Sequence, residues 1–118
     1  MIIELPGLST KAVLNSTRSA EALWRSLPIT GQGRLWGKEL YFMVELKLPT
    51  DELRLVVEKG DLAYWPAGPA LCIFFGPTPA SQGNECRAAS PVEVLGRIVA
   101  SPAELEKIKE GPVSLHLG

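Results

Sequence analysis

The chain has 118 residues, of which 46% are hydrophobic, and its 12 basic and 13 acidic residues give a formal net charge of −1. This length predicts a single domain with its own core, and the apolar content is too high for a disordered chain. Because there is neither an excess of positive charge nor a basic block, no nucleic-acid partner is expected.

The first residues, 1–7, lack the basic segment and the long apolar core of a signal peptide. The most apolar stretch, residues 62–79, is interrupted by several prolines and glycines, which is incompatible with a membrane-spanning helix. We therefore expect a cytoplasmic protein that contacts no membrane. In a reducing compartment Cys72 and Cys86 are expected to be free thiols, with a disulfide as the alternative.

The first part of the chain predicts two short strands and a short helix. Residues 2–5 and 11–14 are the strands. In residues 20–27 the apolar side chains recur at positions that share one helical face. Ser16 or Thr17 precedes this segment and can cap the start of the helix.

The next segment, Gly31-Gln32-Gly33, begins like a dinucleotide-binding motif. However, Trp36 stands where the third glycine is required, and the segment follows a helix rather than a strand. We interpret it as a turn that leads into a strand. That strand is predicted over residues 39–48, where the even-numbered side chains are apolar and share one face.

Further strands are predicted over residues 53–58, 70–75, 92–100 and 113–117. The 70–75 segment is apolar throughout, which indicates burial on both faces. Residues 76–91 are expected to be irregular. A second helix begins after Ser101, which can form a capping box with Glu104. One domain over residues 1–118 is therefore expected to be all-β, a closed barrel of about eight strands with two short helices.

The sequence offers little for metal, cofactor or nucleophilic chemistry. Its one histidine, His116, is expected at the surface on the last strand, and a metal site needs several ligands at defined spacing. No Gly-x-Ser-x-Gly motif is present. We expect no metal, no cofactor and no catalytic triad.

The run from Gly60 to Ala80 is the most unusual segment, because it contains four aromatic residues, four prolines and three glycines. Its aromatic side chains either pack in the core or line a hydrophobic cleft. In a cleft, the prolines would stiffen the rim by fixing the backbone angle φ.

This run contains Tyr64-Trp65-Pro66, followed by Phe74-Phe75-Gly76-Pro77-Thr78-Pro79. Together with Trp36-Gly37, Glu39–Phe42 and Ala89–Gly96, it resembles the cyclophilin-like family of small prokaryotic proteins of unknown function. The resemblance covers nearly the whole chain, and it implies a compact miniature of the cyclophilin barrel. It also implies that Phe75 matches a ring lining the proline pocket of true cyclophilins.

The catalytic parts of prolyl isomerases do not carry over with this resemblance. Those enzymes use an arginine from a Phe-His-Arg strand, and no Phe-His-Arg occurs here. Their Phe-Met-x-Gln-Gly-Gly-Asp segment is matched only in part by Phe42-Met43-Val44-Glu45, where a glutamate replaces the glutamine. An ionised Glu45 accepts hydrogen bonds but cannot donate them. No catalytic residue is therefore assigned.

The leading hypothesis is a non-catalytic domain that binds a peptide or a small molecule. The candidate ligand-binding residues are Tyr41, Met43, Glu45, Phe75, Pro79, Tyr64 and Trp65. The first three come from the polar side of the 39–48 strand, the next two form an adjacent wall, and the last two lie nearby. The alternatives are a prolyl cis–trans isomerase with an atypical site, and a hydrolase or lyase of unrecognised type. A homodimer is also considered, because Trp36 and Tyr64 are expected near the surface.

Overall fold

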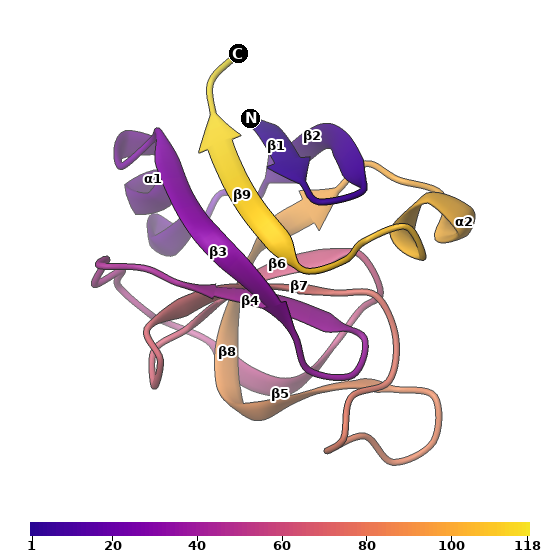
Figure 1. Cartoon of the computed structure of the whole chain (residues 1–118). Helices are drawn as coiled ribbons and strands as arrows, with labels where there is room; N and C mark the ends of the chain where they lie inside the picture. Colours follow the sequence, from indigo (N-terminus) through magenta and orange to yellow (C-terminus); the bar gives the residue numbers. More distant parts are fainter.

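The computed structural model describes residues 1–118 and consists of nine strands and two helices (Figure 1). The strands are β1 (Ile2–Leu5), β2 (Leu8–Leu14), β3 (Ile29–Leu35), β4 (Glu39–Met43), β5 (Leu53–Val57), β6 (Asp61–Trp65), β7 (Ala70–Phe74), β8 (Cys86–Ile98) and β9 (Gly111–His116). The helices are α1 (Arg18–Arg25) and α2 (Pro102–Leu105). Neither helix has the length and apolar character needed to cross a membrane.

Eight of the strands form a closed antiparallel ring in the order β1-β2-β8-β6-β7-β4-β3-β9. The ring is completed at two places, where β9 pairs with β1 and where β2 pairs with the end of β8. The remaining strand, β5, lies outside the ring and pairs only with β8. This arrangement confirms the prediction of an all-β, barrel-like fold with two short helices.

The main core fills the interior of the ring with 21 buried apolar side chains. Both helices contribute to it, with Ala20 and Leu23 from α1 and Leu105 from α2. The predicted caps are present. Thr17 accepts a hydrogen bond from the Ala20 N–H at 3.1 Å, and Ser101 forms the complete capping box at the start of α2.

A second, smaller core lies on the outer face of the sheet, where β5 and the first half of β8 cover β6 and β7. Every residue of β7 is buried as a result. Leu71 and Ile73 face the main core, whereas Cys72 and Phe74 belong to the outer one. The two-sided burial predicted for this strand is confirmed.

The interpretation of Gly31-Gln32-Gly33 as a turn was wrong, because these residues lie within β3. Glycine is required here because there is no room for a side chain, and not because the backbone turns. A Cβ at Gly31 would lie 2.8 Å from the Phe42 ring, and one at Gly33 would lie 2.9 Å from Leu40. Both contacts are closer than real Cβ atoms come, so glycine lets the large side chains of β4 pack against β3.

The strand predicted over residues 39–48 ends at Met43. Its partner β7 begins at Ala70, which pairs with Met43, and the preceding Pro69 has no N–H to donate. The Val44 N–H still reaches the Pro69 carbonyl at 3.0 Å, but no ladder continues beyond it. The predicted alternation holds within β4, since Leu40 and Phe42 face the main core.

Residues 76–91 were expected to be irregular, yet β8 begins at Cys86. Pro91 lies within this strand at an irregularity, because the pairing with β5 shifts register between Arg54 and Val56. Proline is tolerated at such a position since no ladder hydrogen bond is required there. The sequence analysis also missed β6, whose residues pair with both β7 and β8.

Candidate functional site

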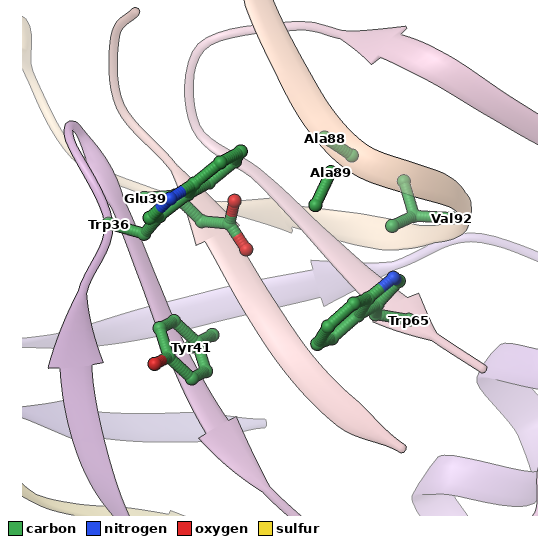
Figure 2. Close-up of a pocket in the computed structure, with 7 residues that line it drawn as sticks. All are labelled: Trp36, Glu39, Tyr41, Trp65, Ala88, Ala89 and Val92. Carbon is green, nitrogen blue, oxygen red and sulfur yellow. The ribbon is translucent and has the colours of Figure 1, made fainter. Parts of the chain in front are cut away.

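A hollow of about 270 Å³ lies on the outer face of the ring, between β4 and the first half of β8. We call it the aromatic hollow, and it is lined by Trp36, Glu39, Tyr41, Trp65, Ala88, Ala89 and Val92. Figure 2 shows the three aromatic rings around the space, with the alanines and the valine on the β8 side. Because the side chains from β8 are small, the rings are not covered and the space stays open.

The aromatic side chains of the hollow are positioned by backbone structure and by one side-chain hydrogen bond. Trp36 lies in the turn between β3 and β4, where its N–H donates to the Glu39 carbonyl at 2.9 Å. Gly37 makes this turn possible with a φ of 59°, a left-handed conformation that glycine adopts without strain. Across the hollow, the Trp65 indole N–H donates to the Ser90 hydroxyl of β8.

Glu39 is the polar group of the aromatic hollow, and it is only 6% exposed. Its Oε1 is buried without any hydrogen-bond partner, and the residue takes part in none of the six ion pairs of the protein. Figure 2 shows the carboxyl group directed into the space between the aromatic rings. A buried carboxyl oxygen without a partner is costly, so its presence in this wall requires a reason.

The surroundings of Glu39 change its acidity. Burial raises the pKa of its carboxyl from 4.5 to about 7, and a hydrogen bond with the Cys72 thiol offsets part of the rise. Burial likewise raises the pKa of the Cys72 thiol, well above its ordinary value. The hollow therefore contains a carboxyl group that changes its charge close to neutral pH.

Two of the seven candidate residues predicted from the sequence, Tyr41 and Trp65, line the aromatic hollow. Met43 and Glu45 are exposed to solvent at the end of β4 and beyond it. They follow Tyr41 along the chain but are not part of the wall. The polar side of this segment thus contributes one predicted residue to the hollow.

The other three candidates lie apart from the hollow. Phe75 is 4% exposed and packs in the main core. Tyr64 is 2% exposed, and its hydroxyl donates to the Leu46 carbonyl at 2.8 Å. It is therefore absent from the surface on which the dimer hypothesis placed it. Pro79 is exposed in the loop before β8. The seven residues do not form one cleft.

The sequence analysis did not identify Glu39 and Trp36 as residues of the candidate site. The signal was present, because Glu39 and Tyr41 share the outward face of a strand and Trp36 stands just before it. Glu39 also pairs with Phe74 of β7, a strand that is apolar on both faces. The outer face of β7 is covered beside Glu39, although Met43 at the far end of β4 is exposed, so the cover depends on which strand crosses at each point.

No cluster of three or more histidine, cysteine or acidic side chains is placed to hold a metal ion. His116 lies at the seam between β1 and β9, where its Nε2 is 2.9 Å from the Glu4 carboxylate. Cys72 and Cys86 are both buried free thiols.

The fold and its sequence place the chain among known proteins. The cyclophilin-like family model matches residues 1–115, and the chain belongs to this family. A hypothetical protein from Archaeoglobus fulgidus, known from its solution structure, is similar over 98% of this chain and 91% of its own. The two share 33% sequence identity, and their structures agree with a TM-score of 0.76. No curated protein matches the chain.

Proposed function

We propose that this protein is a binding module that takes a small organic group, either a free molecule or a side chain of a peptide, into the aromatic hollow. The observation that carries the proposal is a buried carboxyl oxygen without a partner in the wall of an aromatic-lined space. Ligand sites combine apolar walls with a few polar groups that fix orientation, and this hollow has that composition. Its volume of about 270 Å³ lies just below the usual range of ligand pockets, which favours a fragment-sized group.

The prolyl isomerase alternative has weaker support. The family resemblance assigns Phe75 to a proline pocket, but this side chain packs in the main core and does not line an open space. The apolar surface of the hollow comes from other rings, those of Trp36, Tyr41 and Trp65.

A second candidate function is proton-transfer catalysis, and it has one specific observation in its favour. A general acid or base works best when its pKa is close to the working pH, and burial gives Glu39 a pKa of about 7. A hydrolase or lyase acting in the hollow would lose turnover in a Glu39→Gln variant. Binding without turnover of any bound compound would reject this candidate and leave the binding module.

The binding proposal can be tested with the protein's own fluorescence. Trp24 on α1 is the only tryptophan outside the hollow, so a Trp24→Phe variant reports on Trp36 and Trp65 alone. This variant is titrated with a fragment set of small amines, alcohols, amides and acids. We expect a saturable change in emission with at least one of these classes.

The control is a variant that fills the hollow. Ala89 is exposed and lines the hollow, so Ala89→Leu adds bulk inside it without disturbing a core. Ala103→Leu makes the same change on the exposed surface of α2. Binding should disappear in the first variant and persist in the second. If no fragment binds, or if Ala89→Leu binds as well as Ala103→Leu, the proposed function is wrong.

A further inference from the structure

When Glu39 is ionised, the aromatic hollow carries a negative charge that no cation in the protein balances. Glu39 is the only charged residue of its wall. Elsewhere the buried or half-buried carboxylates have partners; Glu93, for example, accepts hydrogen bonds from the backbone N–H groups of Asp51 and Glu52. Glu39 has only the Cys72 thiol, and its Oε1 has no partner. The missing partner of this carboxylate is a hydrogen-bond donor, most favourably one with a positive charge.

The walls of the hollow also favour a positively charged ligand. Trp36, Tyr41 and Trp65 come from three different segments and surround one space (Figure 2). The face of an aromatic ring carries negative charge density and attracts cations, with tryptophan the strongest of the aromatic residues. Desolvation in a small cavity strengthens this attraction.

We propose that the group recognised by the aromatic hollow is a protonated amine, an organic ammonium ion whose N–H donates to the Glu39 carboxylate while its carbon atoms contact Trp36, Tyr41 and Trp65. This inference rests on the proposed function and names the ligand class of the same site. It accounts for the unpartnered oxygen, the absence of an internal cation and the aromatic walls together.

Other ligand classes satisfy fewer of these features. A carboxylate or phosphate would meet both an acidic group and the negative faces of the rings. A metal ion would find one carboxylate where several oxygen ligands are needed, and no further ligands are placed to help. A neutral alcohol or amide could donate to Glu39, but it would gain little from the rings.

The test uses three probes of similar shape and different charge, namely benzylammonium, benzyl alcohol and benzoate. They are titrated at pH 8, where the first is a cation, against the Trp24→Phe protein. We expect benzylammonium to bind at least tenfold more tightly than benzyl alcohol, and benzoate to show no binding. In Glu39→Gln the preference of benzylammonium over benzyl alcohol should fall to less than threefold.

A measurement that needs no Glu39 variant accompanies this comparison, in case Glu39→Gln does not fold. NMR follows the ionisation of the Glu39 carboxyl in the presence of each probe. Benzylammonium should lower the apparent pKa of this carboxyl, because the cation stabilises the carboxylate, whereas benzyl alcohol should not. Absence of this difference overturns the inference.

The outcomes separate the inference from the proposed function. Equal binding of benzylammonium and benzyl alcohol, abolished by Ala89→Leu, would overturn the ammonium inference and keep the binding module. Binding of benzoate alone would also overturn the ammonium inference and keep the binding module. If none of the three probes binds, the ammonium inference fails, and if no member of the wider fragment set binds, the proposed function fails with it.

Discussion

Replacing Glu39 by glutamine should remove a large pH dependence from the stability of the protein. The pKa of Glu39 rises from 4.5 to about 7 on folding because the carboxyl is buried. Between these pH values the folded state binds more protons than the unfolded state, so the free energy of unfolding falls as the pH rises. The stabilisation is complete below pH 4.5 and is lost as the pH passes through about 7.

The size of the effect follows from the same pKa difference. A rise from 4.5 to about 7, at about 1.36 kcal/mol per pKa unit, corresponds to about 3 kcal/mol. Glu39→Gln retains the shape of the side chain but cannot titrate, so its fixed cost is the same at every pH. The unfolding free energy of the wild type minus that of the variant should therefore decrease by about 3 kcal/mol from pH 4 to pH 8.5.

The assay is urea unfolding of both proteins at half-unit intervals of pH. Carboxyls with lowered pKa, such as Asp51 and Glu85, titrate in both proteins and cancel in the difference. Parallel stability curves, within about 0.5 kcal/mol across the whole range, would refute the reasoning, because they would mean that Glu39 ionises normally. An NMR titration of the Glu39 carboxyl with a midpoint near 4.5 would refute it independently.

Two further predictions concern residues first considered as ligand contacts. Phe75→Ala should lower the free energy of unfolding by about 3 kcal/mol or more, because a large core side chain is removed, and leave binding in the aromatic hollow intact. Urea unfolding and the fragment titration test both parts, and a loss of binding without a loss of stability would contradict the assignment to the core. Tyr64→Phe should cost about 1 kcal/mol, because its hydroxyl donates to the Leu46 carbonyl. An unchanged unfolding midpoint would mean that this hydrogen bond contributes nothing.

The sequence predicted those parts of the fold that local patterns determine. The alternation in β4, the two-sided burial of β7 and the caps of both helices are properties of a few adjacent residues. Strand ends were less predictable, because they depend on the partner. β4 ends at Met43 since Pro69 interrupts the neighbouring strand. The glycines of β3 were misread because their role is to accept Phe42 and Leu40 from another strand.

The candidate site was predictable only in part, for a related reason. Tyr41 was identified by its position on the polar side of its strand, and Trp65 as one of the aromatic residues of the Gly60–Ala80 run. Glu39 was counted with the polar face of its strand. What makes it unusual is its place in a hollow whose other side is formed by β8, a strand that the sequence analysis began at Val92 rather than at Cys86. A contact between segments so far apart has no signature in either segment alone.

The closure of the ring has a consequence for synthesis of the chain. β1 needs β9 as its second partner, so Ile2 pairs with His116, and β2 needs the end of β8, so Ala12 pairs with Ile98. Contacts this distant in sequence slow folding, because a long loop must close before they form. During synthesis, the hairpin of β1 and β2 emerges before β8 and β9, so both of its outer edges are unpaired until those strands are made. During that interval these edges are open to strands of other chains, and closure of the ring removes them.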